Sequence, residues 1–375
     1  MNRRNFLKNT TMSSSALMAA ATIPAYIAAQ LNSNTMTAFA EKQPANKFRP
    51  LTLSGLGGVA IGNGFNQNPD IECLQTMEAA WNAGVRYFDT SPWYGLGISE
   101  RRMGLFLKDK PKDSFTISTK IGRILEPKED FKVDANWKGK LNFGYKYDYT
   151  AAGVRKSVED SLHRLGLPSL DIVFIHDLSP DNADMKHNWL KYFDEAAKGA
   201  MPELTKMRQE GLIKGWGLGV NTIEPILKTL EIADPDIFLS ACQYSLIEHE
   251  ADLNKVFPKV AAKGMSIVVG APLCAGFLAG KDRYLYSGDF PKGVKEKLAA
   301  LKRVATNHKV DLRTAALQFA AAPDVVAAVI PGAHTIEQAK QNAASFNEKL
   351  PAAFWEELKS EQLIAANAPT PKAKS

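Results

Sequence analysis

The chain has 375 residues, of which 45% are hydrophobic and 23% are charged, and its net charge is +6 at pH 7. These proportions are typical of a globular protein and exclude a collagenous or low-complexity chain. Basic residues are not interleaved with aromatic ones in any stretch, so we do not expect nucleic acid as a partner. Three cysteines exclude a disulfide framework, and no C-x-x-C or H-E-x-x-H motif indicates a metal site.

The first forty residues have the features of an export signal. Arg3 and Arg4 stand before Lys8, and an apolar stretch of small residues follows at 10–29. This order matches the twin-arginine signal, and cleavage sites are available at 38–40 or within 25–29. Serines and a proline interrupt the stretch, so we expect no stable membrane insertion. We predict a signal peptide at 1–40, the Tat export machinery as its partner and a periplasmic protein; the alternative is a flexible basic N-terminus.

From Leu51 onward, short apolar runs alternate with helical stretches. The runs carry Val, Ile and Phe on consecutive positions, as in strands buried on both faces. Gly84, Gly166, Gly211 and Gly264 precede four of them, at positions where a helix can end. The predicted strands are Gly57–Ile61, Val85–Asp89, Phe115–Thr119, Asp171–His176, Gly215–Val220, Ile237–Gln243, Ser266–Gly270 and Val325–Ile330.

Eight such β/α units within residues 41–364 favour an α/β fold of the (β/α)8 TIM-barrel type. A doubly wound sheet is the alternative, but no G-x-G-x-x-G opens the first unit. Two long connections rich in aromatic residues, Arg123–Tyr149 and Asp177–Asp194, would lie on the C-terminal face, where barrels build their sites. We expect most of these aromatic residues to pack the loops onto the barrel. Residues 365–375 are expected to form a flexible tail.

Four polar residues fall at the ends of predicted strands or just after them. Asp89 ends the second strand, Tyr94 follows in the next loop, Lys120 follows the third strand and His176 ends the fourth. Taken singly, each has a structural explanation, such as a helix cap or a hydrogen-bonded core histidine. A barrel gathers successive strand ends around one mouth, so we expect the four to converge.

Together these residues make a coherent acid–base unit. Reduction of a carbonyl creates an oxyanion that must receive a proton, and Tyr94 can donate it if Lys120 lowers its pKa. Asp89 would balance the buried lysine, and His176 would donate a hydrogen bond to the carbonyl oxygen.

The sequence resembles the aldo-keto reductases from about Leu53 to Phe346. The segment around 85–104, with Gly-Val-Arg-Tyr-Phe-Asp-Thr-Ser-x-x-Tyr-Gly, carries the resemblance, as does Ile-Pro-Gly at 330–332 followed by Asn342. The resemblance implies an NAD(P)-dependent oxidoreductase on a (β/α)8 barrel. It also implies a catalytic tetrad of Asp89, Tyr94, Lys120 and His176.

The resemblance further implies the residues that hold the nicotinamide nucleotide. Two departures stand out: Gly270 replaces an aromatic residue that stacks on nicotinamide in many members, and 332–334 lack the Lys or Arg that often binds a 2′-phosphate. The resemblance implies NADP as the cofactor, because many members of the family use it, and NAD remains the alternative. The implied cofactor residues are Asn221 and Gln243 for the carboxamide, Pro272, Leu273 and Gly276 for the pyrophosphate, and Gly332, His334, Gln338 and Asn342 for the adenosine end.

Within the family, the segments 147–150 and 157–162 resemble the aldose 1-dehydrogenase and fucose dehydrogenase branch. This implies a small-molecule carbonyl or sugar substrate, such as an aldose or another polar aldehyde or hemiacetal. The alternative is a nicotinamide-binding regulatory or partner protein with little turnover, which the complete tetrad disfavours. Because a periplasm offers little free nucleotide, export of such an enzyme predicts that the cofactor binds before export.

Overall fold

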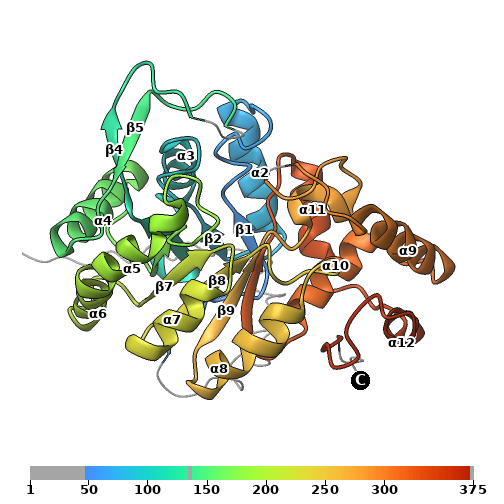
Figure 1. Cartoon of the computed structure of the whole chain (residues 1–375). Coiled ribbons are helices and arrows are strands. Elements are labelled where there is room, and N and C mark those ends of the chain that lie inside the picture. Colours follow the sequence, from blue (N-terminus) through green and yellow to red (C-terminus); the bar gives the residue numbers. More distant parts are fainter. Residues whose placement is uncertain (1–46, 134–136, 287, 372–375) are drawn as a thin grey trace, which may run out of the picture. The chain divides into compact units, whose positions relative to one another are not determined.

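The computed structural model describes residues 47–133, 137–286 and 288–371, and the predicted signal peptide lies outside them. Eight parallel strands form one sheet in the order β1-β2-β3-β6-β7-β8-β9-β10 (Figure 1). Parallel bridges between Ser54 and Val329 and between Gly57 and Gly332 join its two ends, which confirms the (β/α)8 barrel. The strands are β1 (Gly55–Gly57), β2 (Tyr87–Asp89), β3 (Thr116–Ile121), β6 (Ile172–His176), β7 (Gly215–Val220), β8 (Ile237–Ala241), β9 (Ser266–Gly270) and β10 (Val326–Ile330).

Helices cover the outside of this barrel (Figure 1). In α4 (Ala151–Leu165) an apolar stripe faces inward, with Val154 and Val158 buried, and Gly166 ends the helix at a φ of 63°. The helices are α2 (Asp70–Asn82), α3 (Ile98–Leu107), α4 (Ala151–Leu165), α5 (Trp189–Lys198), α6 (Ala200–Gln209), α7 (Glu224–Ile232), α8 (Phe257–Ala262), α9 (Val294–Asn307), α10 (Leu312–Ala321), α11 (Ile336–Ser345) and α12 (Ala352–Ser360).

The first strand differs from its prediction. β1 occupies Gly55–Gly57, whereas the apolar residues up to Ile61 lie in a turn and are largely buried there. A Cβ atom at Gly57 would lie 2.8 Å from the Ile330 carbonyl oxygen, so glycine permits the close approach of β1 to β10. A short buried apolar run cannot be assigned to a strand or a turn by its pattern alone, which explains the error.

The connection after β3 contains a hairpin that the sequence pattern did not predict. β4 (Arg123–Pro127) and β5 (Phe143–Tyr147) pair antiparallel and form a sheet of their own beside the barrel (Figure 1). Charged residues interrupt both strands, so neither has the continuous apolar run that identified the barrel strands. The hairpin stands next to the ends of β2 and β3, where the four polar residues converge.

The barrel interior is filled by side chains from alternate positions of the strands. This inner cluster comprises Tyr87, Ile172, Phe174, Ile237, Leu239, Ala241, Val268, Ala328 and Ile330, all of them buried, and a larger cluster packs the strands against the outer helices. The barrel is therefore a packed core, and the two large cavities among the described residues lie above the strand ends.

The segment expected to be a flexible tail makes defined contacts over residues 365–371. Ala368 is 1% exposed, and the Ala365 N–H donates to Nε2 of the buried His249 at 3.0 Å. Asn367 also donates to Asn254 Oδ1 at 2.9 Å. This part of the segment is thus packed against the barrel, although its composition of small and polar residues suggested otherwise.

Candidate active site

Three neighbouring strands and one turn bring the four predicted catalytic side chains together. β2 pairs with β3 and β3 pairs with β6, so Asp89, Lys120 and His176 lie side by side at the C-terminal end of the barrel. Tyr94 comes from the turn after β2, and its ring meets the His176 ring edge-on with 5.7 Å between the centroids. The convergence expected from strand order is therefore present.

Asp89 and Lys120 form an ion pair beneath the cavity. Lys120 Nζ donates to Asp89 Oδ1 and Oδ2 at 2.9 and 2.7 Å, and to the Thr90 carbonyl oxygen at 2.8 Å. Ser118 Oγ donates to Asp89 Oδ1 at 2.7 Å. Both charged side chains are 1% exposed, and their burial raises the pKa of Asp89 and lowers the pKa of Lys120, while their mutual attraction opposes both shifts. All three ammonium protons of Lys120 have acceptors.

Tyr94 lies beside this pair with its side chain partly exposed in the cavity. The pKa of Tyr94 is raised well above its usual value, mainly because the side chain is removed from bulk water and secondly because Asp89 is negatively charged. The expectation that Lys120 lowers this pKa is not met, because Asp89 neutralises the ammonium charge and receives two of its protons. The phenol is therefore protonated at neutral pH and is ready to donate a proton.

His176 is buried opposite Tyr94. Ser91 Oγ lies 3.0 Å from His176 Nδ1. The pKa of His176 is lowered well below its usual value, mainly by burial and secondly by the positive charges of Lys120 and Arg123. The ring is therefore neutral at pH 7. A neutral imidazole still carries one N–H that can donate to an oxygen atom. Tyr94 and His176 can thus both donate hydrogen bonds to one oxygen atom placed between them.

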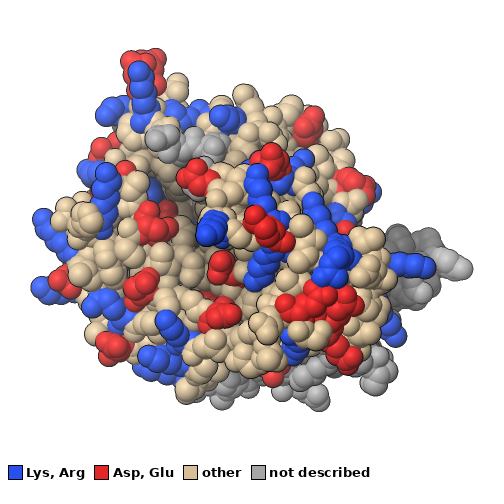
Figure 2. Space-filling model, turned by 45° about the vertical axis from the view of Figure 1, so that its right-hand side comes forward, with Lys and Arg blue, Asp and Glu red and all other residues tan. Residues whose placement is uncertain are grey.

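A cavity of about 790 Å³ opens above these residues. Trp93 lines it, with its ring edge-on to Trp137 at 5.6 Å and to Tyr145 at 5.2 Å. Asp177 and Asp181 line the same cavity from the loop after β6. Figure 2 shows a hollow in the molecular surface with acidic and basic side chains around it. Some aromatic residues of the long connection after β3, including Trp137 and Tyr145, therefore form the walls of this cavity.

Sequence reasoning missed Arg123, Asp177 and Asp181 as cavity residues. Arg123 pairs with Asp177, with 2.9 Å between Nη1 and Oδ2. The signal was present in the chain, because Arg123 lies three residues after Lys120 and Asp177 directly follows His176. Charged residues that immediately follow a buried strand of a barrel reach the same mouth as the strand-end residues.

A second cavity, of about 320 Å³, borders the first at Tyr94 and Tyr286 and extends to the start of α11. Asn221 and Gln243 line the larger cavity instead, where Gln243 Nε2 donates to the Asn221 carbonyl oxygen at 2.5 Å. The other predicted cofactor residues lie together along the second cavity: Pro272, Leu273, Gly276, Gly332, His334, Gln338 and Asn342.

The chemistry of this second cavity fits a nucleotide with anionic phosphates. Lys281, Arg283 and Arg313 line it, although the sequence pattern did not identify them. Within the described residues, Arg313 Nε and His334 Nδ1 are buried without a hydrogen-bond partner. Such groups are rare unless a ligand or water meets them. The pKa of His334 is lowered to about 4, mainly by burial and secondly by the positive charges of Arg283 and Lys281. His334 is therefore neutral at pH 7, and the positive charge of the cavity comes from Lys281, Arg283 and Arg313.

Gly270, at the end of β9, has no space for a side chain. A Cβ atom there would lie 2.9 Å from Ala241 Cβ, so a larger residue would require the strand to move. Tyr286 lines both cavities from the other side, and its ring is parallel to that of Phe65 at 6.3 Å. Aromatic rings therefore reach this junction from loops and not from the end of β9.

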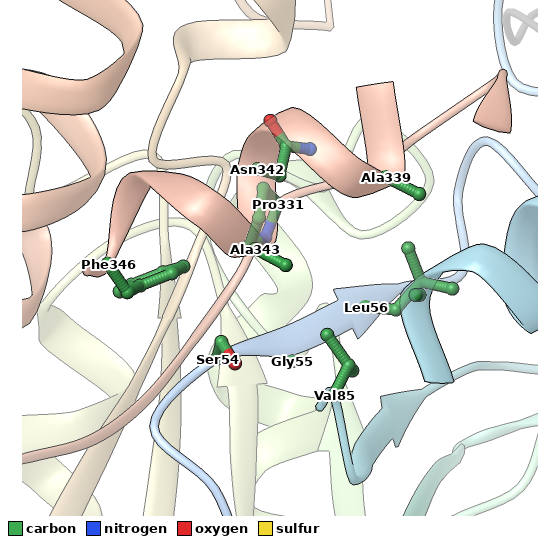
Figure 3. Close-up of a pocket in the computed structure, with 10 residues that line it drawn as sticks. Ser54, Gly55, Leu56, Val85, Pro331, Ala339, Asn342, Ala343 and Phe346 are labelled. Carbon is green, nitrogen blue, oxygen red and sulfur yellow. The ribbon is translucent and has the colours of Figure 1, made fainter. Parts of the chain in front are cut away.

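A small hollow lies behind the nucleotide-sized cavity, between β1, β10 and α11. Figure 3 shows residues of α11, among them Ala343 and Phe346, on one side of it, and Ser54 and Gly55 on the other. Its volume of about 10 Å³ holds no more than one water molecule. Asn342 Nδ2 donates to the Gly332 carbonyl oxygen at 3.2 Å, which ties α11 to the segment that follows β10. This hollow is a packing feature and not a ligand site.

Other site types were sought over the same described ranges. There, His, Cys, Asp and Glu side chains form no cluster of three or more that could hold a metal ion. No helix in these ranges combines the length and the apolar character needed to cross a membrane.

Comparisons with known proteins agree with this geometry. Residues 55–362 match the aldo/keto reductase family. D-threo-aldose 1-dehydrogenase from a Pseudomonas species is 35% identical over 327 residues, which cover 84% of this chain and 94% of that protein. Pyridoxal 4-dehydrogenase from Microbacterium luteolum is 32% identical over 332 residues, which cover 84% and 95%.

Solved structures support the fold. An aldo-keto reductase from Bacillus halodurans, in its holo form, aligns with a TM-score of 0.64 at 23% identity and covers 86% of this chain and 97% of that one. A glycerol dehydrogenase from Gluconobacter oxydans aligns with a TM-score of 0.63 at 24% identity and covers 86% and 94%. Because the family match spans most of the described barrel and two relatives exceed 30% identity over nearly their whole length, the chain belongs to the aldo/keto reductase family, NAD(P)-dependent oxidoreductases that act on carbonyl or alcohol groups.

Proposed function

We propose that the protein oxidises the C1 hydroxyl of an aldose in its cyclic hemiacetal form, with NADP as the preferred cofactor, and reduces polar aldehydes by the same residues in reverse. The observation that carries this proposal is the position of the contact between Tyr94 and His176. They lie at the floor of a cavity whose walls combine aromatic rings with carboxylates. The names of two relatives support it, since aldoses and pyridoxal both form cyclic hemiacetals.

The cavity walls suit a sugar. A sugar ring presents C–H groups on its faces, which pack on rings such as Trp93 and Tyr145, and hydroxyl groups at its edge. Asp177 and Asp181 are acceptors that such hydroxyl groups can reach within the same cavity. Arg123 and Asn221 already pair with these two carboxylates, but a wholly apolar carbonyl compound would displace water from their remaining lone pairs without replacing its hydrogen bonds. The cavity therefore favours a polyhydroxylated substrate.

Four side chains would divide the chemical work. A nicotinamide nucleotide held by the second cavity would supply the hydride acceptor for C1. Tyr94 takes the proton of the C1 hydroxyl in oxidation and returns it in reduction. His176 donates a hydrogen bond to the same oxygen atom and orients it. Lys120 and Asp89 hold the floor and keep a fixed dipole beneath Tyr94, since all three ammonium protons are bound.

The proposed NADP preference is supported by the cations of the second cavity. A 2′-phosphate adds negative charge at the adenosine end, and Lys281, Arg283 and Arg313 line that region with His334 and Gln338. Asn221 and Gln243 are placed to hold the carboxamide. Titration of the apo-protein with each nucleotide tests the preference, and a tenfold difference corresponds to about 1.4 kcal/mol. Tighter binding of NAD would contradict this part of the proposal and leave the acid–base roles intact.

Turnover with a panel of substrates tests the activity itself. D- and L-aldoses, pyridoxal and small aldehydes would be assayed with NADP and NAD by absorbance of the reduced nucleotide. We expect the highest kcat/KM with an aldose. Failure to turn over any of them, with nucleotide binding intact, would contradict the proposal and favour a regulatory nicotinamide-binding protein.

We also propose that the protein reaches the periplasm through its twin-arginine signal with the nucleotide already bound. Arg283 packs on Phe65 at 3.9 Å, and Phe65 stacks on Tyr286, so side chains from two loops meet at the edge of the nucleotide-sized cavity. An exported enzyme would recycle the nucleotide in place by alternating oxidation and reduction. Mass spectrometry of periplasmic protein after long dialysis tests this, and empty protein with micromolar or weaker affinity would contradict it. Retention of an Arg3→Lys, Arg4→Lys variant in the cytoplasm would support the route.

A further inference from the structure

Arg123 is the one charged side chain beside His176 that the roles above do not use. It begins β4, its side chain is 6% exposed, and its guanidinium lies over the rings of Trp93, Tyr145 and Tyr147 at 4.6, 5.3 and 5.1 Å. Its Nη1 donates to Asp177 Oδ2 at 2.9 Å and lies 3.5 Å from His176 Nδ1. Three aromatic rings and one carboxylate thus fix the guanidinium against the imidazole.

Asp177 is turned towards the same imidazole by an unusual backbone. It follows β6 directly and has a φ of 48°, in the left-handed region that residues other than glycine seldom adopt. This conformation is strained for a residue other than glycine and is retained where surrounding contacts impose it. Asp177 Oδ1 lies 3.4 Å from His176 Nε2, while Oδ2 accepts from Arg123. Arg123, Asp177 and His176 therefore close a ring of contacts.

The partners of His176 Nδ1 determine where the imidazole proton lies. A guanidinium has only donors, so Arg123 Nη1 cannot accept a proton from Nδ1. Ser91 Oγ accepts the Trp93 N–H at 3.1 Å, which leaves its hydroxyl hydrogen free to donate to Nδ1 at 3.0 Å. Two donors therefore face Nδ1, and the only acceptor among these contacts, Asp177 Oδ1, faces Nε2. The ring proton belongs on Nε2.

We propose that Arg123 is a positioning residue for the reaction: together with Ser91 it keeps the proton of His176 on Nε2, so that this N–H donates to the reacting oxygen of the substrate. Asp177 holds Arg123 in place, and its Oδ1 is the carboxylate oxygen that lies 3.4 Å from Nε2. The inference rests on the proposed oxidoreductase activity for its consequence, but the proton position is a property of the protein alone.

Charged groups from several elements surround His176, and their sum gives the direction of the effect. Lys120 on β3 and Arg123 on β4 are positive, Asp177 follows His176 itself, and the Tyr94 phenol meets the ring edge. Lys120 is neutralised by Asp89. Removal of Arg123 therefore takes away a cation that disfavours protonation and leaves Asp177 unpaired, and both changes make the imidazole easier to protonate.

NMR of ring-¹⁵N-labelled histidine tests the proposal without reference to turnover. The chain has six histidines, and His176 is assigned by loss of its signals in His176→Gln. In the native protein we expect a protonated Nε2 and an unprotonated Nδ1. In Arg123→Met/Asp177→Asn, which removes both partners of the ion pair and so avoids an unpaired buried charge, we expect a mixture of both tautomers. In Arg123→Met alone, His176 should titrate at a higher pH.

Kinetics with the best substrate give the second readout. Removal of an oxyanion donor costs about 10²–10³ in kcat, so misplacement of its proton should lower kcat by about tenfold in the double variant. Asp177→Asn alone is the reference for KM, because it removes the proposed contact of Asp177 with a sugar hydroxyl group but keeps Arg123. Arg123→Lys restores a donor and should recover part of kcat. Arg155→Met is the matched control, because Arg155 lies half-exposed on α4 and pairs with Glu203 and Glu210 away from the cavity.

Three results would overturn the inference. A native His176 with its proton on Nδ1 would do so directly. So would a double variant that keeps the Nε2 tautomer and full kcat, because Ser91 alone would then suffice. An equal loss of kcat in Arg155→Met would show a general effect of losing an arginine. If no substrate turns over, the proposed function fails, but the NMR result still decides the proton position.

Discussion

Lys120 lies over the face of the Tyr94 ring, with its ammonium nitrogen 4.6 Å from the ring centre, and its three protons are directed to Asp89 and Thr90. The lysine therefore acts on the phenol through its field and not through a hydrogen bond to the hydroxyl group. With Asp89 directly behind it, that field is largely cancelled, and the pKa of Tyr94 stays above its usual value.

Replacement of Tyr94 by Phe tests the acid–base role. Tyr94→Phe keeps the ring and removes the hydroxyl group, so kcat should fall by roughly 10²–10⁴. Nucleotide affinity, measured by fluorescence titration, should remain within a few fold. Tyr192→Phe, on α5 and away from the four residues, serves as the control. Normal turnover by Tyr94→Phe would show that another group moves the proton.

The raised pKa of Tyr94 predicts opposite pH profiles for the two directions. Oxidation needs the deprotonated phenol, so kcat/KM for an aldose should rise with pH well into the alkaline range. Reduction needs the protonated phenol and should be flat through neutral pH. Initial rates between pH 6 and about 10 measure both, and an oxidation profile that levels off below neutral pH would contradict the raised value.

Lys120 is expected to serve both folding and activity, and two variants separate these effects. Lys120→Met leaves the Asp89 carboxylate buried and unpaired, which should cost about 3–5 kcal/mol of stability. Lys120→Met/Asp89→Leu removes both charges and should recover most of this loss in a urea titration. The kcat of this double variant should stay low because the fixed dipole of Lys120 and Asp89 beneath Tyr94 is gone. Recovered activity in the double variant would show that the pair is purely structural.

The charges of the nucleotide-sized cavity predict a selective loss of affinity. Arg313→Leu removes a guanidinium group that lines the cavity and whose Nε is buried with no partner among the described residues. If it faces the 2′-phosphate, Kd for NADP should rise about tenfold or more while Kd for NAD changes little. Isothermal titration calorimetry with both nucleotides measures this. Arg303→Leu, on α9 and paired with Glu361, is the control.

Replacement of the buried Asp252 by Asn is predicted to stabilise the folded protein at high pH. Its carboxylate is buried in the π-helical turn 252–256, and burial raises its pKa to about 7, against a usual value of 3.8. Because the folded state binds the proton more tightly, stability should fall as pH rises from about 4 to 7. Asp252→Asn should therefore raise the free energy of unfolding by a few kcal/mol at pH 8 and by little at pH 4. Thermal melts at both values, with the exposed Asp109→Asn as control, check this.

The sequence predicted the barrel because its buried strands show as continuous apolar runs. It predicted that the four polar residues converge because Asp89, Lys120 and His176 stand where such runs end and Tyr94 follows in the next loop. It did not predict the hairpin, whose strands owe their pairing to each other and carry charges such as Lys146 and Glu126. It also missed Arg313, which belongs to α10 and reaches the cavity only through the tertiary fold.

The predicted influence of Lys120 on Tyr94 was wrong for a related reason. Chain positions indicate which residues share a strand end, but they do not indicate which acceptors a lysine will meet. The carbonyl oxygen of Thr90 and both oxygens of Asp89 take its protons, and only coordinates show that. Electrostatic roles therefore needed the structure, whereas membership of the site did not.

The two strands of the hairpin β4–β5 pair only with each other, yet the hairpin contributes Tyr145 to the cavity wall and is tied to the loop after β6, since Tyr145 and Tyr147 both donate to Asp184. A change of residue or length at its tip would not alter any pairing of the eight barrel strands. Substrate preference can therefore change at the tip of the hairpin, whereas its first residue, Arg123, is constrained by its contacts with Asp177 and His176.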